Sequence, residues 1–268
     1  VPAESFGAAL NYFTGSKDHN IALRRVAISK GMKLSEYGVF KMGKQIAGKT
    51  EEDVYKILGL KYIEPELREN TGEVEASKKN NLPDLINYND LKGDLQVQTK
   101  WTDGSHSIEE MAQEAKKIGL EYIVITDHTR SLAMTGGLDE KKLERQGNEI
   151  DKVNKKVKDI TVLKGAEVNI MKDGSLDIKD EALKKLDVVG ASVHSLFSLP
   201  GEEQTKRIIK AMHNPHVDII FHPTGRVIKR REPYDVNMEA LIDAAKETGT
   251  VLEIDAYPDR LDLKDEHI

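Results

Sequence analysis

Short apolar segments alternate with amphipathic helical segments along the chain, from about Lys92 to its last residue. The apolar runs predict strands at residues 94–98, 122–126, 160–168, 187–194, 218–222 and 250–255. Apolar positions that recur every three to four residues predict helices at 107–118, 140–158, 202–213 and 237–248. Strands that alternate with helices in this way are typical of parallel β-α-β units. We therefore expect an α/β domain built on a parallel sheet.

The first 70 residues follow a different pattern. We expect a helix over about 16–30, a strand-like segment at 34–40, and a second helix that starts near Thr50. Ser16 is a suitable N-cap for the first helix, and Gly31 follows its last turn. The run from Thr50 to Asp53 resembles a capping box. These elements predict a small α+β domain.

A polar stretch separates the two patterns. Residues 69–90 contain Gly72, the polar run 78–81 and Pro83, which are features of a linker. We therefore expect one domain at residues 1–70, a linker at 71–91, and a second domain at 92–268.

The composition is that of a globular protein, with 32% charged and 38% hydrophobic residues among 268. There is no cysteine, which excludes disulfides and thiolate metal ligands and suits a reducing cytoplasm. No apolar run approaches 18 residues, so we expect no membrane partner and a cytoplasmic protein. The chain begins at Val1 rather than at a methionine, and we expect it to be a fragment.

The formal net charge of -6 conceals an uneven distribution of charge. Residues 1–49 hold eight Lys or Arg against three Asp or Glu, whereas the rest of the chain is acidic. A basic first segment favours contact with nucleic acid. A merely solvated surface would explain the same charges.

Residues able to bind metals or move protons recur at the ends of the predicted strands. They are Asp103, His128, Glu167, His194 and His222. In parallel (β/α) barrels the carboxyl ends of the strands meet at one face, where active sites lie. Imidazoles and carboxylates are the usual ligands of Zn²⁺ and are also suited to Mn²⁺. Their positions therefore predict an active site at that face.

Five segments in order resemble the motifs of the polymerase and histidinol phosphatase (PHP) family, over about residues 92–268. The opening segment is Gly93–Gly104, and the others are Thr126-Asp127-His128, Gly165-Ala166-Glu167, Ser192-Val193-His194-Ser195 and His222-Pro223-Thr224-Gly225-Arg226. The resemblance implies a distorted (β/α)7 barrel with up to three metal ions. Its seventh strand would lie beyond Ile268, so we expect the last strand to be missing.

The resemblance also implies roles for individual residues. Glu167 would bridge two metals and would form one site with His194 and His222, suited to Zn²⁺ or Mn²⁺. Asp103 and His128 would supply two ligands of another site. The family has two histidines where this chain has Gln96 and Gln98, and an amide oxygen is a far weaker ligand than an imidazole. We therefore expect metal-dependent phosphoester cleavage to be weakened or lost. Alternatively, the three histidines are hydrogen-bonded core residues in a scaffold without chemistry.

A basic loop follows His222 directly. Residues 226–231 contain Arg226 and three further cations, a pattern suited to phosphate contact, although a solvated loop has the same composition. The segment 253–263 also fits the family pattern, and we expect it to be part of the scaffold.

Residues 12–24, followed by 34–38, resemble the thumb of the family X DNA polymerases. The resemblance implies that Tyr12 and Phe13 line the sugar of an incoming dNTP, and that Asn20 and Arg24 touch the minor groove at the nascent base pair. Lys17, Asn20 and Arg24 share one face of the predicted helix. Gly15 and Ser16 are expected to present open backbone N–H groups at its N-terminus. An amphipathic helix with a wet face is the alternative.

A thumb followed by a PHP domain indicates part of a family X DNA polymerase that fills gaps in DNA. Its partners would be gapped or primer-template DNA and a dNTP, and we expect a monomer. The palm, whose carboxylates would bind Mg²⁺, is absent: residues 1–70 contain no Asp-x-Asp pair, so this chain alone should not polymerise. Two alternatives stay open, a PHP domain that only positions DNA and a small-molecule metallo-phosphatase.

Overall fold

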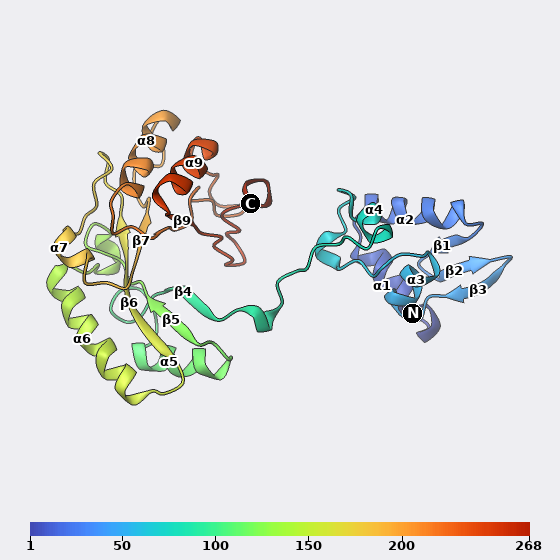
Figure 1. Ribbon diagram of the computed structural model, residues 1–268, viewed down its shortest axis with the longest axis horizontal. Helices are drawn as coiled ribbons and strands as arrows, with labels where there is room; N and C mark the ends of the chain where they lie inside the picture. The colour runs from blue at the N-terminus through green and yellow to red at the C-terminus, as the bar shows by residue number, and fades with distance from the viewer. The chain divides into compact units, whose positions relative to one another are not determined.

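The computed structural model describes residues 1–268, with the side chains of Tyr88 and Ala133 excepted. The chain divides into two compact units, Val1–Ile86 and Asn87–Ile268, both visible in Figure 1. Residues 71–86, which we expected to form most of a linker, belong to the first unit and contain a short helix, α4 (Glu73–Lys78).

The first unit combines helices with a small antiparallel sheet. Its other helices are α1 (Phe6–Thr14), α2 (Lys17–Ser29) and α3 (Glu51–Ile57). Its strands are β1 (Lys33–Ser35), β2 (Gly38–Lys41) and β3 (Lys44–Ala47), paired in that order. The α+β character expected from the sequence is therefore present.

Two helix starts in this unit are set by predicted caps. The Ser16 Oγ accepts the N–H of His19 at 3.2 Å, and the Thr50 Oγ1 accepts the N–H of Asp53 at 3.2 Å. Both N-cap predictions are confirmed. The single strand expected at 34–40 is instead β1, a turn and β2. Gly38 permits this turn because its φ is +137° and its backbone lies against Gln45 and Ala47.

The core of the first unit contains a polar network as well as apolar residues. The His19 Nδ1 lies 2.6 Å from a Glu73 carboxylate oxygen, and its Nε2 lies 2.9 Å from the Tyr55 hydroxyl. The Asn11 amide donates to that hydroxyl at 2.9 Å. Since Tyr55 must then donate to Nε2, the His19 ring is neutral and donates from Nδ1 to Glu73. The network thus joins α4 to α2.

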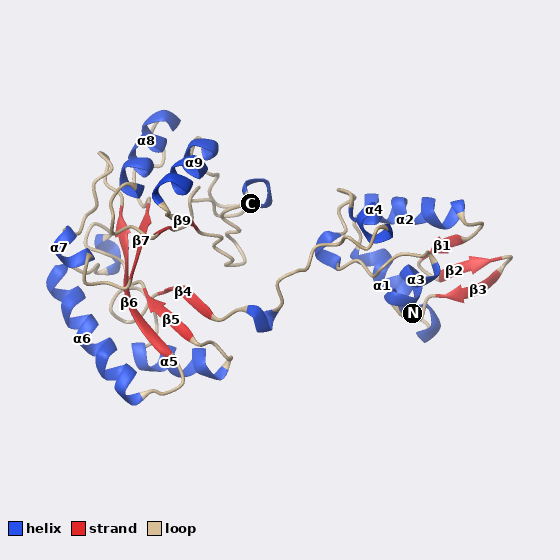
Figure 2. Cartoon of the chain, viewed as in Figure 1, coloured by secondary structure: helices blue, strands red, loops and turns tan.

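The second unit is built on a six-stranded sheet in which all neighbouring strands are parallel. In spatial and chain order they are β4 (Gly93–Val97), β5 (Tyr122–Ile125), β6 (Thr161–Asn169), β7 (Val188–Ser192), β8 (Ile219–Ile220) and β9 (Val251–Leu252). The helices are α5 (Ile108–Lys117), α6 (Glu140–Lys156), α7 (Asp180–Leu183), α8 (Gly201–Met212) and α9 (Met238–Thr248). Figure 2 shows the sheet curled into a half-barrel with these helices along its outer side. The predicted α/β fold is confirmed.

Strand lengths differ from the prediction at the end of the chain. β8 and β9 are two residues each, shorter than the runs predicted at 218–222 and 250–255. His222, just beyond β8, has a φ of +31°, so the backbone turns out of the ladder there. None of the helices among the described residues is long and apolar enough to cross a lipid bilayer.

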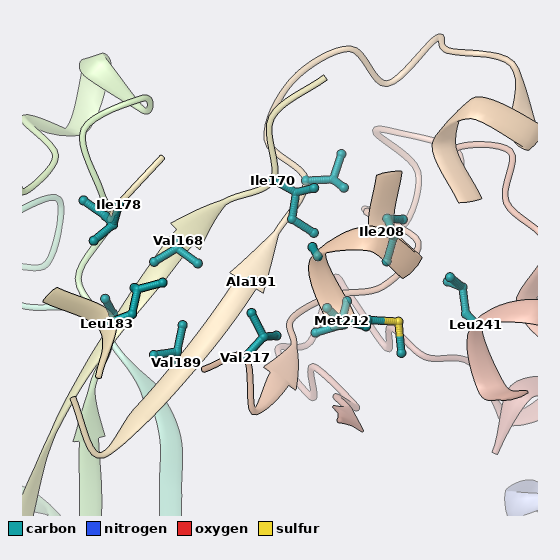
Figure 3. Packing of buried hydrophobic residues seen from close by; sticks show 14 of the residues in the cluster. Val168, Ile170, Ile178, Leu183, Val189, Ala191, Ile208, Met212, Val217 and Leu241 are labelled. Atoms are coloured by element: carbon teal, nitrogen blue, oxygen red, sulfur yellow. The ribbon is translucent and has the colours of Figure 1, made fainter. Parts of the chain in front are cut away.

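Apolar side chains of the central strands pack against the outer helices, as Figure 3 shows. Val168 and Ala191 are fully buried and belong to one cluster with Ile208, Met212 and Leu241 of α8 and α9. Gly190 lies so close to the Phe221 ring that an added Cβ would approach it to 1.9 Å. This packing fixes the strand ends from which the candidate site residues project.

The His19 network makes the stability of the first unit depend on pH. Burial lowers the pKa of His19 from 6.5, although Glu73 beside it acts in the opposite direction. Burial would raise the pKa of Glu73, but hydrogen bonds from His19 and nearby backbone N–H groups lower it. The unfolded chain therefore binds more protons at both positions, and stability falls as pH decreases. We expect the urea midpoint of this unit to fall between about pH 6.5 and 4.5, mainly through His19.

The test is urea unfolding of the whole chain at pH 7.5 and at pH 5.5, monitored by circular dichroism. His19→Asn should reduce the difference between the two midpoints, while His213→Asn, which removes an exposed histidine of α8's C-terminal end, should leave it unchanged. An equal pH effect in wild type and His19→Asn would contradict the neutral ring.

Candidate metal centre

The predicted ligands meet at the carboxyl ends of the strands. Glu167 lies on β6, and Asp103, His128, His194 and His222 follow β4, β5, β7 and β8. One ligand atom from each of His128, Glu167 and His194 lies within 4.8 Å of the others. All five residues line an open cavity of about 1040 Å³, together with Gln96 and Gln98. The sequence thus predicted the convergence, and the structure shows its geometry.

Glu167 is the centre of the cluster and is 1% exposed. Its Oε1 accepts the Ser192 hydroxyl at 2.6 Å and lies 3.0 Å from His222 Nε2 and 3.1 Å from His194 Nε2. Its Oε2 lies 3.3 Å from His128 Nδ1. Three imidazoles from three loops therefore surround one buried carboxylate.

The electrostatics follow from this arrangement. Burial alone would raise the pKa of Glu167, but hydrogen bonds and positive charge from His194 and His222 hold it well below its usual range. Glu167 is thus an anion in the interior, and a buried anion requires a cation or several donors beside it.

The distances fit an ion bound between these groups. Tetrahedral Zn²⁺ with bonds of about 2.0–2.1 Å places neighbouring ligand atoms about 3.3 Å apart. The nitrogens of His128, His194 and His222 lie 3.0 to 3.3 Å from the Glu167 oxygens. The His128 Nδ1 is buried and makes no hydrogen bond, although it lies 3.3 Å from Oε2. His128 Nδ1 and Glu167 Oε2 are thus close without a hydrogen bond between them, at a spacing that a shared ion would also give.

Gln98 and Gln96, at the two expected ligand positions, take part in hydrogen bonds. The Gln98 Nε2 donates to Glu167 Oε2 at 3.2 Å, so an amide N–H stands where the family places an imidazole nitrogen. Gln96 lines the cavity, and its backbone N–H donates to Asp94 at 3.0 Å. Asp103 is about half exposed and its Oδ2 lies 3.4 Å from His128 Nε2.

The side chain of Asp127, next to His128, has a structural role. Its buried carboxylate accepts the Thr99 N–H, both the Thr99 and Thr102 hydroxyls, and the Gln146 amide, at 2.5 to 2.8 Å. These bonds hold the loop that carries Asp103 after β4.

Cations from the basic loop after His222 and from the segment near residue 260 lie around the cavity. The Arg226 guanidinium donates to the backbone carbonyls of Arg260 and Leu261, and Arg226 does not line the cavity. Arg231 and Arg260 do line it. Arg231 also donates to the Gly225 carbonyl at 2.7 Å, and Arg260 lies 3.2 Å from the Asp255 carboxylate, so the three cations differ in whether they line the cavity and not in having partners.

Glu253 is a further residue of the site that we assigned to the scaffold. It lines the cavity, and its carboxylate accepts the His222 N–H at 2.6 Å. Burial, with the charges of Asp255 and Glu167 nearby, raises the pKa of Glu253 to about 8. The contact fixes the left-handed backbone of His222.

In the first unit, the predicted nucleotide-contact residues form one cluster. The Tyr12 and Phe13 rings meet edge to face at 5.1 Å, and both are exposed. The Arg24 guanidinium lies over the Tyr12 ring at 5.4 Å. The Asn20 amide donates to the Tyr12 carbonyl at 2.8 Å and is 9% exposed. Asn20 therefore orients Tyr12, while the Tyr12, Phe13 and Arg24 side chains reach the surface.

The expectation that Gly15 and Ser16 present open N–H groups is wrong. The Gly15 N–H donates to the Asn11 carbonyl at 3.2 Å, and the Ser16 N–H donates to the Arg68 carbonyl at 2.8 Å. Both donors are used inside the unit because the chain turns sharply at Gly15, whose φ is +78°. Lys17, at the start of α2, is exposed.

Comparison with known families agrees with both units. The family model for the DNA polymerase beta thumb matches residues 9–69, and the model for the PHP domain matches residues 94–257. The chain therefore belongs to the PHP domain family, and its first unit is a thumb of the DNA polymerase β type.

Among individual relatives, the DNA polymerase/3'-5' exonuclease PolX of Bacillus subtilis (strain 168) is 43% identical over 270 residues, which is 100% of this chain and 47% of that protein. A probable phosphatase of Thermoanaerobacter sp. (strain X514) is 41% identical over 152 residues, 55% of this chain and 57% of that protein. The chain thus spans about half the length of these relatives. A crystal structure of Leishmania infantum polymerase beta in a ternary P/T complex is 34% identical over 25% of this chain and 33% of its own, with a TM-score of 0.23, too low to compare folds.

Proposed function

We propose that the chain is the thumb and PHP portion of a family X DNA polymerase that repairs gapped DNA. The order of the two units, and 43% identity over the whole chain to the Bacillus subtilis protein, support this. Because the chain spans 47% of that protein, polymerisation belongs to the proposal for the whole molecule. The Mg²⁺-binding carboxylates of a palm would lie outside these residues.

In this proposal the thumb contacts gapped or primer-template DNA and the incoming dNTP. The observation that carries it is the exposed cluster of Tyr12, Phe13 and Arg24. An aromatic pair offers a face to a sugar or base, and the adjacent guanidinium can donate to the shared acceptors of the minor groove. Recognition of this kind checks pair geometry rather than sequence.

The PHP unit, we propose, binds one divalent cation, Zn²⁺ or Mn²⁺. Glu167 and His194 would be two ligands, and His128 is favoured as the third because its ligand atom lies within 4.8 Å of theirs. Such an ion, when bound, supplies an activated water and neutralises charge on a phosphodiester. Arg231 and Arg260 line the same cavity and are suited to hold a phosphate.

Hydrolysis by this unit should be weak, because Gln98 and Gln96 remove two metal ligands. Gln98 turns an amide N–H, which has no lone pair to offer a metal, toward Glu167 Oε2. The Bacillus subtilis relative is named as an exonuclease. The alternative, a PHP unit that only positions DNA, is favoured by the donors that Ser192 and Gln98 already give to Glu167.

Metal content distinguishes these two proposals. The chain, after dialysis against Zn²⁺ or Mn²⁺, should retain about one equivalent by elemental analysis. Glu167→Gln should lower the metal affinity by more than about 100-fold. Loss of a residue that only hydrogen-bonds a ligand costs about 10- to 100-fold, and loss of the ligand itself should cost more. Glu121→Gln, which removes an exposed carboxylate paired with Lys92, is the matched control and should bind like wild type. No metal in wild type would favour the scaffold.

The two glutamines can be tested by restoring the family's residues. Gln96→His and Gln98→His together should raise Mn²⁺-dependent cleavage of a 3′-ended DNA strand by at least tenfold over wild type, because two imidazole ligands are restored. The assay uses the complete parent protein, and the same pair of changes to Asn serves as control. Vigorous cleavage by the unmodified protein would show that the amides do not impair the site.

The thumb is tested through Arg24. Binding of the chain to gapped DNA with dNTP, measured by fluorescence anisotropy, should weaken about tenfold in Arg24→Ala, as expected for a donor to a base edge. Arg25→Ala removes the same charge from an exposed neighbour on α2 and should weaken binding by less than about threefold. Equal losses of DNA affinity in the two variants would show that Arg24 contributes only its positive charge and no specific contact.

A further inference from the structure

A buried chain of hydrogen bonds leads away from His194 on the side opposite Glu167. The His194 Nδ1 lies 2.8 Å from Asn169 Oδ1. The Asn169 Nδ2 donates to Asp177 Oδ2 at 2.8 Å and to the Thr129 hydroxyl oxygen at 3.0 Å. Asn169 and Asp177 are each 5% exposed. Sequence patterns gave no reason to select either residue.

The direction of every bond in this chain is fixed by Asp177. Its Oδ1 accepts the Thr129 hydroxyl at 2.7 Å and the Asn169 N–H at 2.9 Å, and its Oδ2 accepts the Ser131 N–H at 2.9 Å. Because both Asp177 oxygens accept from backbone N–H groups, the amide nitrogen of Asn169, and not its oxygen, faces Asp177. The amide oxygen therefore faces His194, and the proton of a neutral ring must lie on Nδ1.

The consequence lies at the other ring nitrogen. With the proton on Nδ1, a neutral His194 presents the Nε2 lone pair toward Glu167 Oε1, 3.1 Å away. A lone pair and a carboxylate oxygen repel each other at this distance unless a proton or another cation lies between them. A ring with its single proton on Nδ1 is thus set for a metal ligand, whereas a hydrogen bond to Glu167 requires a second ring proton.

We propose that Asn169, oriented by Asp177, is a positioning residue for the metal centre. It fixes the Nδ1–H tautomer of His194 and so directs Nε2 to a divalent cation. The inference rests on the proposed metal binding, and outer hydrogen bonds of this kind commonly set both ring orientation and affinity of ligand histidines.

The test compares two substitutions of Asn169 with a matched control, all in the whole chain. Asn169→Leu removes the oxygen opposite Nδ1, whereas Asn169→Asp keeps an oxygen there. Asn154→Leu removes an amide that bonds only the backbone of Val162 and does not line the cavity. The readouts are the ¹⁵N NMR shifts of the His194 ring in chelator, at a pH where the ring is neutral, and the affinity for Zn²⁺. His194→Gln identifies the signals.

Wild type, Asn169→Asp and Asn154→Leu should show the Nδ1–H tautomer, and Asn169→Leu should shift toward Nε2–H, which can then donate to Glu167. Zn²⁺ affinity should fall about 10- to 100-fold in Asn169→Leu and stay unchanged in Asn154→Leu. An unchanged tautomer in Asn169→Leu overturns the inference, as does an Nε2–H ring in folded Asn169→Asp.

This experiment tests the proposed metal binding and the positioning role of Asn169 separately. If wild type takes up no Zn²⁺, the proposed metal binding fails, and the tautomer in chelator still decides whether Asn169 sets the ring. If wild type binds Zn²⁺ and Asn169→Leu binds it equally well with an altered tautomer, the positioning role fails while the metal centre stands.

Discussion

The second unit depends on how one buried negative charge is stabilised. Glu167 lies at the end of a central strand, 1% exposed, and its carboxylate must be matched by donors or by a cation. The end of β7 and the loops after β5, β7 and β8 each send a group toward it: His128, Ser192, His194 and His222 all lie within 3.3 Å of its oxygens. The half-barrel is suited to this because parallel strands bring their carboxyl ends together. Removal of the charge would leave three imidazoles without their common partner.

The groups around Glu167 are not equivalent. Ser192 and Gln98 can only satisfy the carboxylate by donating, and they lend it no charge. The three histidines can supply positive charge themselves or present lone pairs to an ion that does. The Asn169–Asp177 chain favours lone pairs presented to an ion. The hydrogen bond to Asn169 Oδ1 holds the single proton of a neutral His194 ring on Nδ1, away from Glu167. The centre therefore combines a carboxylate whose two oxygens each accept one uncharged donor with imidazoles arranged for a cation.

The sequence predicted the features that depend on local order along the chain. The six parallel strands, the caps at Ser16 and Thr50, and the meeting of Glu167 with the histidines all follow from periodicity and strand-end position. It could not predict contacts between distant residues whose types are individually ordinary. Glu73 lies 54 residues from His19, and Asn169 reaches Thr129 across 40. Nor could it show that Arg226 is tied to backbone carbonyls, since that depends on the path of the segment 260–261.

His19 and His194 show how the same side chain meets different sets of partners in the two units. His19 has a donor at one nitrogen, the Tyr55 hydroxyl, and an acceptor at the other, Glu73, so a neutral ring satisfies both. Burial raises the pKa of Tyr55, which keeps that hydroxyl a donor. His194 has oxygen acceptors at both nitrogens, Asn169 Oδ1 and Glu167 Oε1, so a neutral ring cannot satisfy both. A neutral His194 ring carries one proton but faces two acceptors, so it needs a second proton or a metal ion. The pattern of partners, rather than burial or residue type, therefore separates the two: a neutral His19 is satisfied within the core, whereas His194 is suited to bind a cation.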